Sequence, residues 1–317
     1  MHLNHFSAGL EPLDMTVLDE FSSLKNSAND LGISFHDTVR YHSRNTVVRH
    51  QRFHYLEWGE PDRPAVILLH GGNQSAHSWD LVSLNLSARY HVFALDQRGH
   101  GDSEWSRAAS YGIDELADDV LAFIRELKIS RPMIIGHSMG GMAALAAAVR
   151  RPDVPSAMVI IDIGPETNEQ GTRMIRDFVS GNIEFDDLEE FVDRVEKYDP
   201  YRTRAHIERT IKYNLMKRAD GRYVPKTDRR RFHPEGGELG ERVPGAPSLT
   251  TLAGLTVPTL VVRGAESTVL DPDAARRFSE AMPGGELVTV ARCGHNVASQ
   301  NTTGFLAVVA PFLARHR

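Results

Sequence analysis

The chain has 317 residues, of which 41% are hydrophobic and 25% charged, and it carries a formal net charge of −6 and a single cysteine. The negative charge argues against a nucleic-acid-binding surface, and the lone Cys293 excludes an internal disulfide and a multi-cysteine metal site. No apolar run approaches the ~20 residues that span a bilayer, and the first residues lack the pattern of a signal peptide. We therefore expect a cytoplasmic protein with no membrane or nucleic-acid partner, no metal and no cofactor.

Residues 1–40 are predicted to form an N-terminal extension. Pro12 could open a short helix, because apolar residues recur at every third position in Met15, Leu18, Phe21 and Leu24. This helix could pack on the body of the protein or on a second copy of the chain. A homodimer is therefore one expectation for the assembly.

Strand and helix patterns alternate through most of the remaining chain. Residues 46–58 suggest a hairpin, and short apolar runs predict strands at Ala65–Leu69, Val92–Leu95, Met133–Ile135, Ala157–Ile161, Thr259–Val262 and Glu286–Val290. Helical patterns lie between them at Asp114–Lys128, Met139–Arg151 and Asp271–Met282. Nearly continuous apolar strands joined by helical crossovers predict an α/β fold with a mostly parallel sheet covered on both faces.

The alternation fails between residues 165 and 256, which we predict to be an inserted cap. The core would then comprise residues 41–164 and 257–317. Helix-like stretches occur within the cap at Thr172–Val179, Leu188–Tyr198 and Thr203–Met216. The following segment, Lys226–Pro247, is rich in Gly and Pro and is predicted to be a long loop. We favour a solvated loop over an anion site for its run Arg229–Arg231.

A Gly-His-Ser-Met-Gly motif at residues 136–140 follows a predicted strand and precedes a predicted helix rich in Ala. In this strand–turn–helix context the pattern indicates a sharp turn that exposes a nucleophilic serine, Ser138. The flanking glycines leave room where side chains would collide with neighbouring backbone.

Small residues also follow the predicted strand Ala65–Leu69, in the sequence His-Gly-Gly-Asn at residues 70–73. In this context the backbone N–H of Gly72, with Asn73 as an alternative, would join that of Met139 to form an oxyanion hole. Such donors stabilise the negative charge that develops on a carbonyl oxygen during acyl transfer. His70 is expected to be structural.

The order of these motifs closely resembles that of the α/β-hydrolase fold superfamily. The chain shows His-Gly-Gly, then Asp-Gln-Arg-Gly-His-Gly-Asp-Ser at residues 96–103, then the serine motif, and finally a late Gly-His at residues 294–295. The resemblance covers residues 46–315. It implies an eight-stranded, mostly parallel sheet with helices on both faces and an inserted helical cap, and it gives His100 and Asp102 no catalytic role.

His295 is the candidate general base. It follows the last predicted strand, in a loop from which it can reach Ser138, and a histidine can take up and return a proton near neutral pH. Cys293 is expected to be a small buried residue, since nothing in the sequence pairs it with a base of its own.

The acid is where the chain departs from the commonest family pattern. That pattern places an Asp shortly after the penultimate strand, where this chain has Ser267. Asp162, at the end of the strand beside the serine strand, is our preferred acid, because some family members use this earlier position. Asp271 and Glu266 remain alternatives.

These residues predict a serine hydrolase that cleaves an ester, lactone or related acyl bond of a small molecule through an acyl-enzyme intermediate. The alternatives are a C–C bond or amide hydrolase on the same triad, and a non-catalytic small-molecule-binding protein of the same fold.

The substrate-binding residues stay unknown. Cap side chains are candidates for an apolar pocket or for holding a substrate carboxylate. The aromatic candidates are Phe178, Phe185, Phe191, Tyr198, Tyr201, Tyr213, Tyr223 and Phe232, and the cationic ones are Arg173, Arg176, Arg202 and Arg204.

Overall fold

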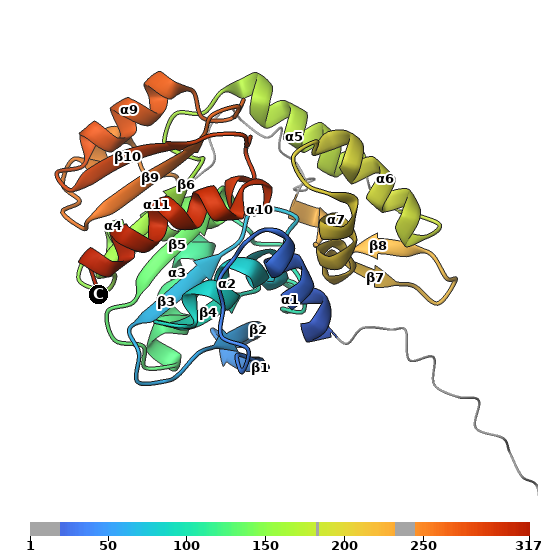
Figure 1. Cartoon of the computed structure of the whole chain (residues 1–317). Coiled ribbons are helices and arrows are strands. Elements are labelled where there is room, and N and C mark those ends of the chain that lie inside the picture. Colours follow the sequence, from blue (N-terminus) through green and yellow to red (C-terminus); the bar gives the residue numbers. More distant parts are fainter. Residues whose placement is uncertain (1–19, 182–183, 232–244) are drawn as a thin grey trace, which may run out of the picture.

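A single eight-stranded sheet forms the centre of the computed structural model, which describes residues 20–181, 184–231 and 245–317 (Figure 1). The strand order is β1-β2-β4-β3-β5-β6-β9-β10; β2 pairs antiparallel with β1 and with β4, and all other pairs are parallel. The predicted mostly parallel, eight-stranded sheet is thus confirmed. Its strands are β1 (Tyr41–Val48), β2 (Gln51–Trp58), β3 (Ala65–Leu69), β4 (His91–Leu95), β5 (Met133–His137), β6 (Ala157–Ile161), β9 (Thr259–Gly264) and β10 (Gly285–Val290).

Helices cover both faces of the sheet, as Figure 1 shows. Alternate residues of β3 point to opposite faces, so that Ile67 and Leu69 join one buried cluster while Val66 and Leu68 join the other. The first cluster includes α3 (Ile113–Glu126), α4 (Met139–Arg150), α8 (Leu249–Leu252) and α9 (Pro272–Ala281). The second includes α1 (Glu20–Asp30), the 3-10 turn η1 (Ala76–Trp79), α2 (Asp80–Leu86), α10 (Val297–Gln300) and α11 (Thr302–Arg315).

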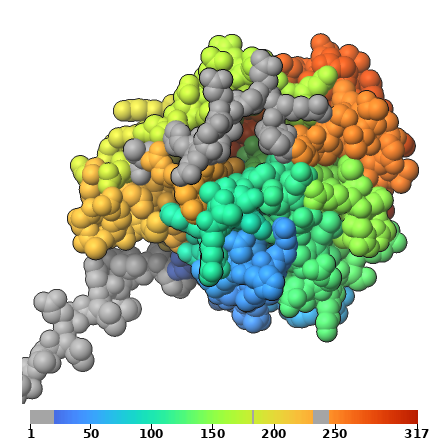
Figure 2. Space-filling view, turned by 180° about the vertical axis from the view of Figure 1, so that it is seen from behind, coloured from blue at the N-terminus to red at the C-terminus, as the bar shows by residue number. Residues whose placement is uncertain are grey.

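Part of the chain between β6 and β9 forms a lobe with a buried cluster of its own, centred on Phe185, Phe191 and Ile207. The predicted cap boundary at residue 256 is too late, because α8 packs into the first cluster of the body. Figure 2 shows the gold part of this segment as a lobe at the left of the view, beside the blue-green part of the body. The sequence predicted helix as far as Met216, but the helix ends at Ile211 and a short hairpin follows. The cap elements are α5 (Glu169–Gly181), α6 (Leu188–Tyr198), α7 (Arg204–Ile211), η2 (Lys212–Asn214), β7 (Leu215–Lys217), β8 (Tyr223–Pro225) and η3 (Arg229–Arg231).

The N-terminal helix α1 packs on the body. Leu24 and Ala28 are fully buried in the second cluster, and Glu20 forms an ion pair with Lys212 of the cap at 3.2 Å. The predicted start of this helix at Pro12 lies outside the described residues. No helix in the described part of the chain is long and apolar enough to cross a membrane.

Candidate active site

Ser138 lies at the apex of the turn between β5 and α4. Its backbone has a positive φ, with φ +50° and ψ −117°, a conformation that residues other than glycine rarely adopt, and its N–H donates to the carbonyl of Ile161 at 3.1 Å. A side chain at Gly136 would collide with the backbone of Gly140, and one at Gly140 would collide with the carbonyl of Leu69. Glycine is therefore required on both sides of the serine, which is partly exposed.

Asp162 directly follows β6, which pairs in parallel with β5, so its carboxylate lies at the same edge of the sheet as Ser138. The side chain is fully buried. Its Oδ1 accepts the N–H of Gly264 at 3.0 Å, and its Oδ2 accepts Nδ1–H of His295 at 2.8 Å and the hydroxyl of Ser267. A buried carboxylate with several hydrogen-bond donors is rigidly held in one orientation.

The two alternative acids make other contacts. Glu266 accepts a hydrogen bond from the Tyr201 hydroxyl at 2.8 Å, and Asp271 accepts one from the Asn168 amide at 3.3 Å. The structure pairs His295 with Asp162, as the sequence led us to prefer. Ser267, which stands where the family resemblance led us to expect an acid, donates its hydroxyl to Asp162 instead.

The imidazole of His295 is oriented by its bond to Asp162 and is largely buried, with 13% of the side chain exposed. Because Nδ1 carries the proton in this bond, Nε2 is the ring nitrogen left to accept a proton. His137 donates from Nε2 to the backbone carbonyl of His295 at 2.9 Å. Burial, and then the proximity of His295, hold the pKa of His137 well below its ordinary value, so His137 is a neutral support for the loop. Sequence reasoning assigned it no role, although it directly precedes Ser138.

The predicted oxyanion donors lie on either side of the serine turn. Gly72 follows β3, and Met139 is the first residue of α4, where backbone N–H groups have no partner within the helix. No intramolecular hydrogen bond in the described part of the chain uses the N–H of either residue. Likewise, no hydrogen bond among the described residues joins the Ser138 hydroxyl to His295.

The expectation of a solvated loop fits Arg230, whose side chain is half exposed, but it is wrong for Arg231. The guanidinium of Arg231 donates from Nη1 to His100 Nε2 and from Nη2 to Met139 Sδ, the latter at 3.0 Å. It also lies beside Gly72, 3.5 Å from the position that a Cβ on this residue would occupy. Burial lowers the pKa of Arg231 to about 10. A residue of the segment between β6 and β9 therefore reaches the side chain of Met139, which follows the serine, and the loop after β3 that contains Gly72.

Most other candidates from the sequence serve the fold. His70 is fully buried and accepts the N–H of Gln97 at 3.0 Å, consistent with a structural residue. Burial also raises the pKa of the Cys293 thiol to about 11, which disfavours the thiolate that a nucleophile needs.

The cap candidates likewise have structural contacts. Arg204 pairs with four carboxylates of the cap, and Arg202 pairs with Asp199. Phe185 and Phe191 belong to the cap core. Arg173 and Arg176 are exposed, and Phe232 lies outside the described residues.

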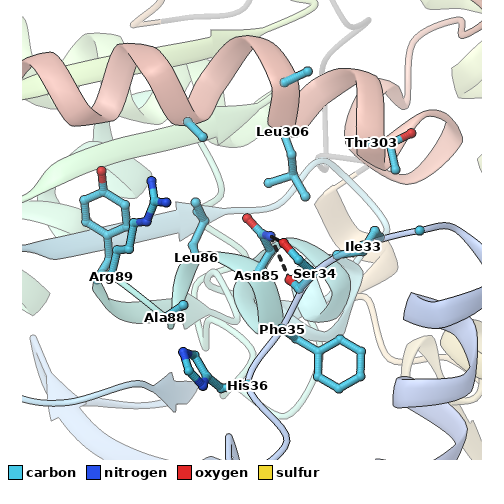
Figure 3. Close-up of a pocket in the computed structure, with 14 residues that line it drawn as sticks. Ile33, Ser34, Phe35, His36, Asn85, Leu86, Ala88, Arg89, Thr303 and Leu306 are labelled. Carbon is cyan, nitrogen blue, oxygen red and sulfur yellow. Dashed lines mark hydrogen bonds between the residues drawn. The ribbon is translucent and has the colours of Figure 1, made fainter.

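Two further features are separate from the serine turn. Figure 3 shows a cavity of about 560 Å³ beside α2 and α11, where Asn85 donates to the Ser34 carbonyl at 2.8 Å; none of Ser138, Asp162 and His295 borders it. A buried cluster near the loop after β4 contains His54 and Asp96, joined at 2.7 Å. Asp96 also accepts two backbone N–H groups, so its oxygens support the loop.

Comparison with known proteins agrees with this geometry. The family model of the α/β hydrolase fold matches residues 64–302. The chain is 26% identical to the esterase Rv0045c of Mycobacterium tuberculosis, over 93% of this chain and 96% of that protein. It is 27% identical to an sn-1-specific diacylglycerol lipase of Mus musculus, over 81% of this chain and 83% of that protein. The solved structure of E-2-(acetamidomethylene)succinate hydrolase matches with a TM-score of 0.76 at 22% identity, covering 87% of this chain and all of that one. The chain therefore belongs to the α/β hydrolase fold family and is a hydrolase.

Proposed function

We propose that this hydrolase is a serine hydrolase that cleaves a carboxylic ester, lactone or related acyl bond of a small molecule. The observation that supports this most is the buried Asp162–His295 hydrogen bond at 2.8 Å, on the sheet edge where Ser138 forms a strained turn. A serine, a carboxylate and an imidazole that meet at one edge of the sheet are the groups that acyl transfer through a serine requires.

In the proposed mechanism, the Ser138 hydroxyl attacks the substrate carbonyl while His295 Nε2 takes up its proton. Asp162 stabilises the imidazolium through Nδ1–H and keeps the ring in its orientation. The negative charge on the carbonyl oxygen is stabilised by the N–H groups of Gly72 and Met139. Collapse of this intermediate breaks the bond to the leaving group, which takes the proton from His295, and an acyl-enzyme remains.

Water then completes the reaction. His295 takes a proton from the water, whose oxygen attacks the acyl carbon, and Ser138 leaves with the proton returned by the imidazole. The Ser138–His295 hydrogen bond would form when substrate binds, since such bonds are often long or misaligned in unliganded enzymes.

Ester hydrolysis is favoured over the alternatives by the relatives, because an esterase and a diacylglycerol lipase are similar to the chain over most of its length. Amide and C–C bond hydrolysis on the same triad are the second candidate. A protein that only bound a ligand would not need the oriented pair of Asp162 and His295.

The test is the hydrolysis of p-nitrophenyl butyrate by the purified protein and by its Ser138→Ala variant. We expect the variant to lose activity by on the order of 10⁴-fold or more while its circular dichroism and melting temperature stay unchanged. A folded variant that retained more than about a tenth of the activity would refute the assignment.

A further inference from the structure

The loop that carries His295 is held by a glutamine side chain on each side of the base. Before His295, the N–H of Gly294 donates to Oε1 of Gln300 at 2.7 Å. After it, Oδ1 of Asn296 accepts a hydrogen bond from Nε2 of Gln74 at 3.1 Å. Gln300 ends the helix α10, which follows this loop directly, whereas Gln74 lies in the loop after β3 and is 222 positions away from Asn296 in the sequence. The second contact therefore joins two loops that are distant in the sequence.

The other end of the Gln74 amide is bonded to the loop that contains Gly72. Oε1 of Gln74 accepts the N–H of Gly71 at 2.9 Å, and the backbone N–H of Gln74 donates to the carbonyl of Gly71 at 3.3 Å. These two bonds close the turn from Gly71 to Gln74, in which Asn73 has a φ of +64°. The turn therefore holds the backbone around Gly72, whose N–H is a proposed oxyanion donor.

The amide of Gln74 can make both side-chain bonds in one orientation. The N–H of Gly71 requires an acceptor, so the oxygen of the amide faces Gly71 and its NH₂ group faces Asn296. Within the described residues, the side chain of Asn296 has no other hydrogen-bond partner. Gln74 is thus a direct bridge from the loop after β3 to the residue that follows His295.

His137 packs against both loops that Gln74 joins. It donates from Nε2 to the carbonyl of His295 at 2.9 Å, and a Cβ on Gly71 would lie 2.6 Å from its Nδ1. Nδ1 is also 3.2 Å from Oε1 of Gln74, but a neutral imidazole has one N–H and cannot donate to both oxygens at once. Removing the amide of Gln74 would therefore leave the bond from His137 to His295 in place.

We propose that Gln74 is a positioning residue that keeps the oxyanion donor Gly72 and the base His295 at a fixed separation. This inference rests on the proposed serine hydrolase function. Charge develops on the substrate carbonyl oxygen in the same step in which His295 takes up the proton of Ser138, so both groups must be in place together. A bridge between their loops acts on this transition state, whereas substrate binding depends little on it.

The test is a double-mutant cycle of Gln74 and Asn296 on the hydrolysis of p-nitrophenyl butyrate. Gln74→Met keeps the length of the side chain but removes both amide groups, and Asn296→Ala removes the acceptor beside His295. Gln51→Met is the matched control, because Gln51 is also partly buried but donates to the carbonyl of Trp105 at 3.5 Å. kcat and KM are measured separately for the wild type, the single variants and the double variant, well below the melting temperature of each.

We expect Gln74→Met to lower kcat by about tenfold to 100-fold and to change KM by less than about threefold, because a displacement of about 1 Å can cost on the order of 10²-fold in rate. Asn296→Ala should lower kcat by about threefold to tenfold, since His137 and Gln300 still hold the loop. The double variant should be no slower than Gln74→Met, because the bridge is already broken. Gln51→Met should keep both constants.

Three results would overturn the inference. They are an unchanged kcat in Gln74→Met, a rise in KM without a fall in kcat, and effects that multiply in the double variant. A loss in Gln74→Met that disappears once the rate is corrected for the folded fraction would show a contribution to stability alone, and it would overturn the inference as well.

A second comparison covers the case in which Gln74→Met does not fold. Asn296→Asp keeps an oxygen that can accept the N–H of Gln74, whereas Asn296→Ala does not. The added carboxylate should raise the pKa of His295, so kcat is compared on the alkaline plateau of each pH profile. Asn296→Asp should there be close to the wild type, and a plateau as low as that of Asn296→Ala would overturn the inference.

Failure of the proposed function can be told apart from failure of the bridge. The proposed function fails, and the inference with it, if the wild type does not cleave the ester or if Ser138→Ala retains the activity. Ser138-dependent cleavage with an unchanged kcat in Gln74→Met refutes the role of Gln74 alone.

Discussion

The sheet edge that carries Ser138 and the cap beside it are held in place by different interactions. The edge is built from strands whose side chains are almost completely buried, such as β5 and β6. The cap has only a small apolar cluster of its own and is joined to the body by polar contacts. These include Arg209–Asp80, Lys226–Asp102, Ser75–Asn214, Tyr201–Glu266 and Gln300–Asp199.

Because the two regions are held by different interactions, we expect the sheet edge to determine the reaction and the cap to determine which substrates are preferred. Apolar strands fix the backbone from which Ser138 and Asp162 project, so the proposed reacting groups depend little on the cap. Arg231 contacts Met139 of the same turn from a segment in which Asp228 is held by polar bonds. Changes at the sheet edge should therefore abolish turnover, whereas changes in the cap should alter preference or stability.

The largest effect should come from the base. His295→Ala should lower kcat/KM by on the order of 10⁴-fold, about as much as Ser138→Ala, because the serine hydroxyl would lose its proton acceptor. Steady-state rates of both single variants and of the double variant would measure this. A double variant far slower than either single one would show that the two residues act independently.

Replacing the acid should have the next largest effect. Asp162→Asn should cost roughly 10²–10⁴ in kcat, because the amide keeps the shape but no longer stabilises the imidazolium. It should also lower the free energy of unfolding by about 1–3 kcal/mol, since an amide NH₂ would face a buried donor such as the Gly264 N–H. Glu266→Gln and Asp271→Asn are the controls and should stay within about tenfold of wild type. The reverse ranking in kcat would place the acid in the loop after β9.

A smaller effect should follow from removing the hydroxyl that supports the acid. Ser267→Ala removes a donor to Asp162 Oδ2 but leaves the bonds from Gly264 and His295 in place. We expect kcat to fall by about threefold to tenfold, consistent with the loss of one supporting hydrogen bond. A loss as large as that of Asp162→Asn would mean that Ser267 contacts the reacting groups directly.

The cap should respond to pH through His206. Burial lowers the pKa of this histidine from 6.5 to about 3, so the folded protein keeps it neutral. The unfolded chain takes up a proton below pH 6.5, so the stability contributed by His206 is present above this pH and is lost as pH falls. Between pH 6 and 4 the free energy of unfolding, measured with denaturant, should therefore fall less steeply with decreasing pH in His206→Gln than in the wild type. The difference in slope should be about 1.4 kcal/mol per pH unit. His42→Gln, on the exposed edge strand β1, is the control, and equal slopes in both variants would refute this account.

The sequence predicted the sheet edge far better than the cap. The apolar runs at Ala65–Leu69 and Ala157–Ile161 have the bounds of β3 and β6, because a buried parallel strand reads as a continuous apolar segment. The parallel order of β5 and β6 then brings Ser138 and Asp162 to one edge. The catalytic roles of these residues remain predictions, but their proximity and the bond of Asp162 to His295 are observed.

The sequence did not reveal contacts that single polar side chains make with residues far away in the chain. From the sequence, Ser267 marks only the absence of an expected acid, whereas in the structure it donates a hydrogen bond to Asp162. The sequence predicts a solvated loop around Arg231. In the structure the backbone N–H of Asp228 bonds to Gly99 in the loop after β4, and no pattern of apolar residues announces this contact. Such contacts have no repeating pattern, so only the folded chain identifies them.

The most direct test of the central claim is intact-protein and peptide mass spectrometry after reaction with a fluorophosphonate probe. The account predicts one adduct per chain, located on the peptide that contains Ser138, and much slower labelling in His295→Ala because the serine would lack its base. Labelling that is absent in the folded wild type, or that persists on another residue in Ser138→Ala, would contradict it.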